Sequence, residues 1–226
     1  VLLALVVLSS VAAEDAIYWK NEAVVELQEA LDAQNLNKGI AKNIIFFVGD
    51  GMGIPSVTAG RIYKGQQNGR TGEEEKLHFE NFPHAGLVKT YSTDAQTADS
   101  ASTATAFLCG VKTKKGVIGI DDRVTRASCL SGAGGDVDSI VRHGQYAGKA
   151  SGVVTTTRVT HATPAATYAH SPDRGWETNR PIPLSEKRDG CKDIAQQLAA
   201  NMDLNVVLGG GRATFLSLFH PDPEFP

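Results

Sequence analysis

The stretch Gly152-Val153-Val154-Thr155-Thr156-Thr157 is rich in β-branched residues and predicts a β-strand. The run Arg158-Val159-Thr160-His161-Ala162-Thr163-Pro164 follows it directly. Ligand sites in sheets of parallel strands lie at the carboxyl ends of the strands. His161 and Thr163 stand two residues apart and are therefore candidates to face one site from a loop. The sequence alone somewhat favours the alternative, in which His161 is a structural histidine and Thr163 caps a helix.

Further strands are expected on both sides of this stretch, at residues 44–48, 85–91 and 205–208. Helices are expected at residues 21–34, 101–109, 137–147 and 193–202, and directly after Gly53. Asn21 is the expected cap of the first helix, Pro55 stands near the first turn of the second, and Gly110 stops the third. Strands that alternate with helices predict an α/β fold with a mostly parallel central sheet, flanked by helices on both faces.

Asp50 stands where the continuous apolar run of residues 44–48 ends, between Gly49 and Gly51. Glycines on both sides let the backbone turn sharply and let an ion approach closely. A carboxylate in this place is an oxygen ligand for a hard or borderline cation. An aspartate that caps the next helix has the same pattern, and both interpretations stay open.

The run Asp99-Ser100-Ala101-Ser102-Thr103-Ala104-Thr105-Ala106 places a hydroxyl beside a carboxylate and then supplies only small side chains. A serine is a weak nucleophile at neutral pH unless a base or a metal ion activates it. The small residues allow a helix to begin here, and the free N–H groups of a helix start favour an anion. The run therefore suits a serine that attacks phosphorus, although plain loops and helix caps use the same residues.

Two arginines are candidates to hold a phosphate. Arg158 and Arg174 each carry a planar guanidinium that can donate two hydrogen bonds to one phosphate group, and either is equally explained by a surface ion pair. Together with Asp50, Ser100 and the pair His161 and Thr163, they are the side chains expected for metal-assisted phosphoryl transfer.

The composition narrows the class of protein. The 226 residues include 22 Lys and Arg and 25 Asp and Glu, with no basic block, so nucleic-acid binding is not indicated. Residues 1–13 combine an apolar run with small residues near Ala13 and predict a truncated signal peptide, with a buried strand as the alternative. Cys109 is expected as a buried free thiol. Cys129 and Cys191 lie in polar, loop-like surroundings and are candidates for a disulfide, in which case one free thiol remains.

Four motifs in order along the chain resemble those of alkaline phosphatases, especially the animal type. They are Val48-Gly49-Asp50-Gly51-Met52-Gly53, Asp99-Ser100-Ala101-Ser102-Thr103-Ala104, Thr155-Thr156-Thr157-Arg158-Val159-Thr160-His161-Ala162-Thr163-Pro164 and Leu208-Gly209-Gly210-Gly211-Arg212. The similarity runs from about residue 19 to residue 226. It implies that residues 14–226 are the N-terminal half of a single alkaline phosphatase domain, so that the central sheet is incomplete in this chain.

The resemblance implies a role for each matching residue of the catalytic centre. Asp50 matches the carboxylate that bridges a zinc ion and the neighbouring magnesium ion. Ser100 matches the nucleophile that becomes phosphorylated and also contacts that zinc. Arg174 matches the arginine that grips two phosphate oxygens, and Asp99 resembles the residue that orients it. The match demotes Arg158 to a structural role.

Further residues match outer parts of the family's site. Thr163 matches a magnesium ligand, and His161 takes a position near the magnesium from which its contact is expected to be direct or through water. Cys129 and Cys191 match a disulfide of animal members. Glu224 resembles a ligand of the extra calcium site of animal members.

The implied activity is the hydrolysis of small-molecule phosphate monoesters at alkaline pH through a phosphoserine, with two zinc ions and one magnesium ion in the full-length protein. The remaining zinc ligands of the family lie in a second half, so this chain alone is expected to be inactive. The resemblance also implies a homodimer that is secreted or held on the extracellular face of the cell membrane, where attachment would need a lipid anchor beyond this chain. The alternatives are a truncated chain that binds phosphate or metal without turnover, and a phosphodiesterase of the same superfamily.

Overall fold

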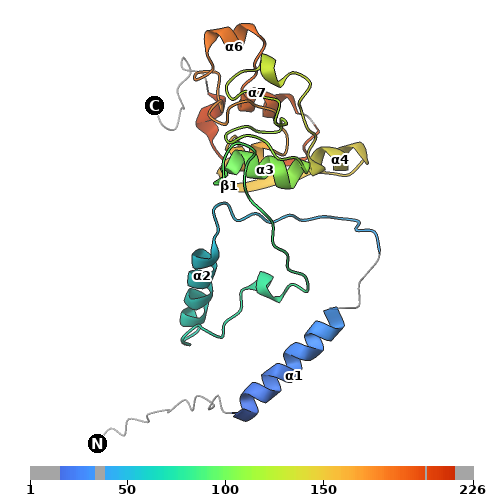
Figure 1. The fold of residues 1–226 in the computed structure, drawn as a ribbon, viewed down its shortest axis with the longest axis vertical. Coiled ribbons are helices and arrows are strands. Elements are labelled where there is room, and N and C mark those ends of the chain that lie inside the picture. Colours follow the sequence, from blue (N-terminus) through green and yellow to red (C-terminus); the bar gives the residue numbers. More distant parts are fainter. Residues whose placement is uncertain (1–15, 34–38, 202, 217–226) are drawn as a thin grey trace, which may run out of the picture. The chain divides into compact units, whose positions relative to one another are not determined.

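The computed structural model describes residues 16–33, 39–201 and 203–216. The chain divides into two compact units, residues 1–87 and residues 88–226, whose positions relative to one another are not determined (Figure 1). The predicted signal peptide, residues 1–13, lies outside the described residues. Within the described ranges, no helix is both long and apolar enough to cross a membrane.

The first unit contains helix α1 (Ala16–Ala33), helix α2 (Ile54–Gln67) and a 3-10 helix (His78–Asn81). Helix α1 confirms the predicted helix but begins earlier, so the expected cap at Asn21 is wrong. Helix α2 begins directly after Gly53 with a proline in its first turn, as predicted. Arg61 pairs with Glu80, and these hydrogen bonds lower the pKa of Glu80 to about 2. This pair ties α2 to the 3-10 helix.

The predicted strand at residues 44–48 does not form within the described chain. The backbone there is neither helix nor strand, and Ile45 and Phe47 are 79% and 85% exposed. Residues 85–91 likewise form no strand, and Leu87 and Val88 are exposed. A strand needs a neighbour to accept and donate its backbone hydrogen bonds, and an apolar sequence alone does not supply one. Both predictions are therefore wrong for this structure.

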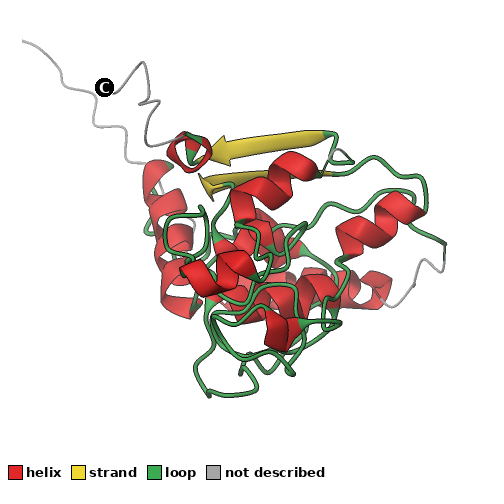
Figure 2. Cartoon of the chain, turned by 90° about the horizontal axis from the view of Figure 1, so that it is seen from above, coloured by secondary structure: helices red, strands yellow, loops and turns green. Residues whose placement is uncertain are grey.

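The second unit carries a two-stranded parallel sheet of β1 (Gly152–Arg158) and β2 (Val206–Gly210). Figure 2 shows the two strands as neighbouring arrows that point the same way. Val153 pairs with Val207, and an irregularity separates this register from that at the end of β1. The even-numbered face is exposed, with Val154 72% and Leu208 59% accessible. The parallel α/β arrangement is confirmed, whereas the expected cover on both faces of the sheet is not present among the described residues.

The core of this unit lies between helix α3 (Ser100–Cys109) and helix α5 (Ala162–Ala165). Most of its buried side chains are alanines, together with Leu108, Ile118 and Ile194. Small side chains let the two helices approach closely. Helix α3 ends at Gly110, whose φ of 72° is the left-handed conformation that glycine adopts without strain, as the sequence predicted.

The second unit contains further helices. They are α4 (Ile140–Tyr146), α6 (Leu184–Arg188), α7 (Ile194–Ala200) and two 3-10 helices (Leu130–Gly132 and Arg212–Phe215). Helices α4 and α7 confirm the predicted helices in shortened form. Each begins at a side-chain cap, because Ser139 accepts from the N–H of Arg142 and Asp193 accepts from that of Gln196.

Cys129 and Cys191 form a disulfide, and Cys109 is a free, partly buried thiol at the end of α3. Burial, and to a lesser degree the charge of Asp138, raises the pKa of Cys109 to about 11. The thiolate is the reactive form, so we expect the folded protein at pH 8 to react with iodoacetamide about 100-fold more slowly than a free cysteine does. After denaturation, one thiol per chain should react. Fast labelling of the folded protein would contradict the burial, and three thiols would contradict the disulfide.

Candidate active site

The site is organised around the N-terminus of α3. Asp99 is extended, with φ −118° and ψ 175°, and its carboxylate accepts a hydrogen bond from the N–H of Ser102 at 3.2 Å. The Ser102 hydroxyl donates to the same Oδ1 at 2.9 Å. Asp99 is therefore the cap of α3, which explains why the helix begins at Ser100.

The Asp99 carboxylate is held in its charged form. Its Oδ1 also accepts from the N–H of Gly116 at 3.0 Å, and its Oδ2 accepts from Nη1 of Arg174 at 2.9 Å. Burial raises the pKa of Asp99, but the hydrogen bonds from Gly116, Arg174 and Ser102 outweigh it and lower the pKa to about 2. A fixed negative charge thus faces the guanidinium of Arg174 and orients it.

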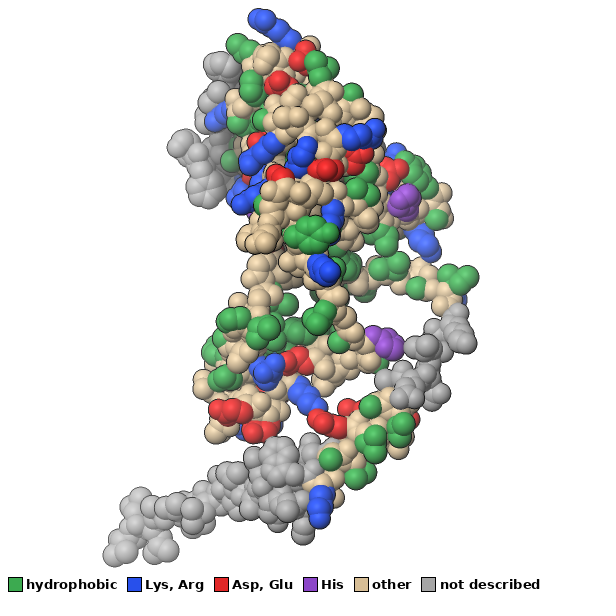
Figure 3. Space-filling view, viewed as in Figure 1, with side chains coloured by type: hydrophobic (Ala, Val, Ile, Leu, Met, Phe, Trp, Pro, Cys, Tyr) green, Lys and Arg blue, Asp and Glu red, His purple; other side chains and the backbone are tan. Residues whose placement is uncertain are grey.

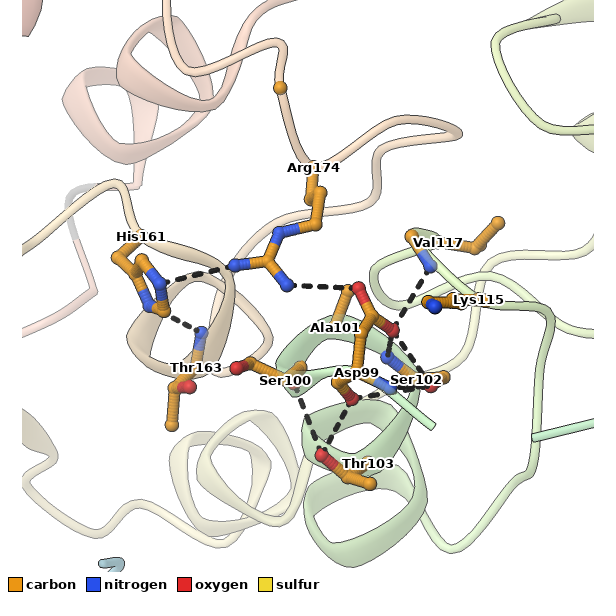
Figure 4. Close-up of polar contacts among 12 residues, drawn as sticks. Asp99, Ser100, Ala101, Ser102, Thr103, Lys115, Val117, His161, Thr163 and Arg174 are labelled. Atoms are coloured by element: carbon orange, nitrogen blue, oxygen red, sulfur yellow. Dashed lines mark hydrogen bonds and ion pairs between the residues drawn. The ribbon is translucent and has the colours of Figure 1, made fainter. Parts of the chain in front are cut away.

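Arg174 lies between two elements of the site, as Figure 4 shows. Its Nη1 contacts Asp99, and its Nη2 lies 3.1 Å from Nε2 of His161. Its backbone N–H donates to the carbonyl of Gly116 at 2.8 Å. The side chain is 29% exposed and offers five N–H donors, more than these two partners use, so it can grip an anion in addition.

His161 and Thr163 stand at the start of α5. Nδ1 of His161 lies 3.4 Å from the N–H of Thr163, and Nε2 faces Arg174 at the shorter distance of 3.1 Å. A neutral imidazole has one acceptor nitrogen, so only one of these two contacts is a hydrogen bond in a given tautomer. The backbone N–H of Thr163 donates to Nδ1, so that His161 caps α5, and Nε2 is the ring nitrogen that faces Arg174. Direct metal binding through Nε2 would require this contact to break.

Of the two serines in the run, Ser100 is the accessible one. Ser102 is 3% exposed, and its hydroxyl is used within the cap. Ser100 is the half-buried first residue of α3. In the view of Figure 4, its hydroxyl points to the side on which Thr163 and His161 lie, and away from the Asp99 carboxylate. The N-terminus of a helix and its dipole favour a bound anion beside it.

The structure thus brings together Asp99, Ser100, His161, Thr163 and Arg174 in the second unit. Asp50 belongs to the first unit, in the turn before α2, so its part in the site stays a prediction. Glu224 lies outside the described residues.

The sequence did not predict the ion pair of Arg158 and Glu177, which lies beside the site. The guanidinium of Arg158 donates two hydrogen bonds to Glu177, from Nε to Oε2 at 2.8 Å and from Nη2 to Oε1 at 2.7 Å. Arg158 therefore has a structural partner, and Arg174 is the better candidate to hold phosphate. The spacing of residues 158 and 177 does not predict this ion pair, because the two side chains meet only through the tertiary fold.

The described part of the chain supplies an incomplete set of donor atoms for a metal. The Thr163 and Ser100 hydroxyls and the Asp50 carboxylate are oxygen donors of the kind that magnesium and zinc accept, but zinc takes about four ligands. Among the described residues, the cluster of Cys129, Glu186 and Cys191 is the one group of three potential ligands within reach of one another. Its cysteines form a disulfide and are not thiolates. The residues present fit part of a metal site by their chemistry, but they do not complete a zinc site.

Comparison with known proteins agrees with this geometry. Residues 41–226 match the model of the alkaline phosphatase family. The chain therefore belongs to that family.

The individual matches are similar over most of this chain. It is 50% identical over 214 residues to the tissue-nonspecific alkaline phosphatase of Gallus gallus, covering 94% of this chain and 41% of that protein. It is also 50% identical to that of Homo sapiens over 213 residues, with coverages of 94% and 41%. The chain thus spans about 41% of the length of these curated relatives.

Solved structures of the family share the fold. The alkaline phosphatase from the Antarctic bacterium TAB5 superposes with a TM-score of 0.54 at 32% identity, covering 76% of this chain and 41% of that one. The cold-active enzyme from Shewanella sp. gives a TM-score of 0.54 at 31% identity, covering 75% and 36%. A variant of the TAB5 enzyme is described with Mg bound in its M3 site.

Proposed function

We propose that the whole protein hydrolyses small-molecule phosphate monoesters through a phosphoserine at Ser100. The observation that carries this proposal is the Arg174 guanidinium, held by Asp99 at 2.9 Å beside the helix end on which Ser100 stands. A charge-fixed arginine next to an accessible hydroxyl and a helix N-terminus is an arrangement that binds a phosphoryl group and places a nucleophile against it.

The residues of this chain account for binding and attack. Arg174 donates two hydrogen bonds to oxygens of the phosphoryl group, while Asp99 keeps the guanidinium in place. The hydroxyl oxygen of Ser100 forms a bond to phosphorus as the bond to the leaving alcohol breaks, and water then cleaves the phosphoserine. A bound zinc or magnesium ion would supply charge stabilisation and an acidified water in such a reaction. Asp50, Ser100 and Thr163 are the residues here that would hold metal, with His161 close by.

The wider assignment rests on the same family membership. We propose two zinc ions and one magnesium ion per complete chain, and a calcium ion near Glu224. We also propose that residues 14–226 form the N-terminal half of one domain and that residues 1–13 are a remnant of a signal peptide.

The disulfide supports a secreted or cell-surface location, since disulfides persist in oxidising compartments. Figure 3 shows acidic and basic side chains mixed over one face of the second unit, which does not suit nucleic acid.

A homodimer is part of the proposal. Helix α1 exposes the stripe Val24, Leu27 and Leu31, which are 66%, 61% and 48% accessible. An apolar stripe on a helix favours packing against another surface. A second subunit would cover this stripe, and so would another part of the whole protein.

Assays of the whole protein and of this chain test the function. With zinc and magnesium at alkaline pH, the whole protein should hydrolyse p-nitrophenyl phosphate, and bis-p-nitrophenyl phosphate far more slowly. The 226-residue chain alone should show no turnover, because the residues that the structure describes do not supply a complete set of metal ligands. Faster turnover of the diester would favour the phosphodiesterase alternative, and turnover by the chain alone would refute the need for further ligands.

A further inference from the structure

The turn that carries Arg174 is fastened at both ends by ion pairs. On one side, Asp173 accepts from Nε of Arg126 at 3.0 Å. On the other side, Glu177 accepts the two hydrogen bonds from Arg158. Neither pair uses the guanidinium of Arg174 itself, so both can act on its position only through the backbone of the turn.

Glu177 is the stronger of the two anchors. Besides Arg158, its Oε2 accepts from the hydroxyl of Thr160 at 2.6 Å, and Thr160 is fully buried. The side chain of Glu177 is 20% exposed. Burial raises the pKa of Glu177, but the hydrogen bonds from Arg158 and Thr160 outweigh this and lower the pKa, so the carboxylate stays charged. Bidentate, charge-assisted hydrogen bonds fix geometry more firmly than single ones.

The partners of Glu177 lie directly before the other half of the site. Arg158 ends β1, and Thr160 immediately precedes His161. Glu177 therefore ties the segment that bears Arg174 to the segment that bears His161 and Thr163. The contact between Arg174 and His161 at 3.1 Å lies between these two fastened segments.

We propose that Glu177, through its pair with Arg158, is a positioning residue that sets where Arg174 stands relative to His161 and Ser100. This inference rests on the proposed function and names a determinant of phosphate affinity in that site. A phosphate grip depends on a bidentate geometry, and a displacement of about 1 Å in such a site costs up to about 100-fold in activity. A looser turn should therefore weaken the grip without removing any group that touches phosphate.

If Glu177 acts only through its charge, its removal has the opposite effect on phosphate affinity. If Glu177 only neutralised Arg158, its removal would free a cation near the site and phosphate would bind more tightly. Removal of Arg158 would then leave phosphate binding unchanged or weaken it only slightly. The positioning role predicts that loss of either partner weakens phosphate binding to a similar degree.

The test uses the whole metal-loaded protein with Glu177→Gln and Arg158→Gln. Glutamine keeps an acceptor for Thr160 and removes the charge of Glu177. We expect each variant to bind orthophosphate about 10-fold more weakly by calorimetry and to raise the KM for p-nitrophenyl phosphate in parallel. Glu177→Asp, which keeps the charge, should recover part of the affinity. Asp203→Asn is the matched control, because it breaks the pair of Arg142 and Asp203 elsewhere in the second unit.

The outcomes separate this inference from the proposed function. If wild type binds and hydrolyses phosphate esters while Glu177→Gln binds orthophosphate as tightly as Asp203→Asn does, the positioning role is overturned and the function stands. Tighter binding by Glu177→Gln alone would also overturn it, in favour of the freed cation. A wild-type protein that neither bound orthophosphate nor hydrolysed monoesters would overturn the proposed function, and the inference with it.

Discussion

Ser100→Ala should abolish the proposed phosphomonoesterase activity of the whole protein, with a loss of kcat of more than about 10⁴-fold, because loss of a catalytic nucleophile costs a hydrolase on that scale. The substitution removes the one atom that is proposed to form a bond to phosphorus. It should leave the fold intact, because alanine is the best helix former and position 100 is half-buried at the start of α3. The loss would therefore report chemistry rather than stability.

Two measurements make this result specific. Steady-state hydrolysis of p-nitrophenyl phosphate gives kcat, and mass spectrometry after acid quenching detects one phosphoryl group on the peptide that contains Ser100 in wild type. The variant should carry none and should still bind orthophosphate, since Arg174 and Asp99 are unchanged. A phosphorylated peptide in the Ser100→Ala protein would contradict the assignment.

Ser102 supplies the comparison within the same helix. Its hydroxyl donates to Asp99 at 2.9 Å, so Ser102→Ala should weaken the cap and the orientation of Arg174. A hydrogen bond to a charged group contributes about 1.5 to 3 kcal/mol, which corresponds to a loss of activity of about 10-fold to 150-fold at most. A larger loss with Ser102→Ala than with Ser100→Ala would identify Ser102 as the nucleophile.

The longer helices α1, α2, α3, α4 and α7 were predictable because their signals are local, whereas the short helices α5 and α6 were not expected. Gly110 ends α3 and Pro55 stands in the first turn of α2 as the sequence indicates, since a left-handed glycine and a first-turn proline act within a few residues. The strands predicted at residues 44–48 and 85–91 did not form, although both segments are clearly apolar. A strand forms only when it pairs with another segment of the chain. Among the described residues, β1 and β2 pair with each other.

The site divides in the same way. The start of a helix beside Ser100, and Ser100 as the candidate nucleophile, were expected from one short run, and the resemblance led to the candidate Arg174. The role of Asp99 as the cap of α3 was not predicted. The ion pair of Arg158 and Glu177 joins residues that are 19 positions apart. The contact depends on the tertiary fold, so their spacing in the sequence does not predict it. The N–H of Gly116 that helps to fix Asp99 is likewise a backbone group, which side-chain patterns do not reveal.

Removal of the disulfide should destabilise the protein strongly. Cys129 and Cys191 are 62 residues apart in sequence, and the loop that they close contains β1, α5 and the turn with Arg174. The chain-entropy model gives about 4 kcal/mol for closing a loop of this length in the unfolded chain. We therefore expect Cys129→Ser with Cys191→Ser to lower the free energy of unfolding by about that amount, and to lower orthophosphate affinity if the turn with Arg174 loosens.

Denaturant titration under non-oxidising and oxidising conditions measures the effect. The double substitution avoids the unpaired thiol that a single one would leave. Cys109→Ser is the control, because this thiol is free and only partly buried, and its replacement should cost less than about 1 kcal/mol on the scale of ordinary point substitutions. Dithiothreitol should bring wild type to the stability of the double variant and leave the double variant unchanged. Equal stability of wild type and double variant in the absence of reductant would show that the crosslink does not constrain the unfolded chain, because the entropy difference between the closed and open loop would then be missing.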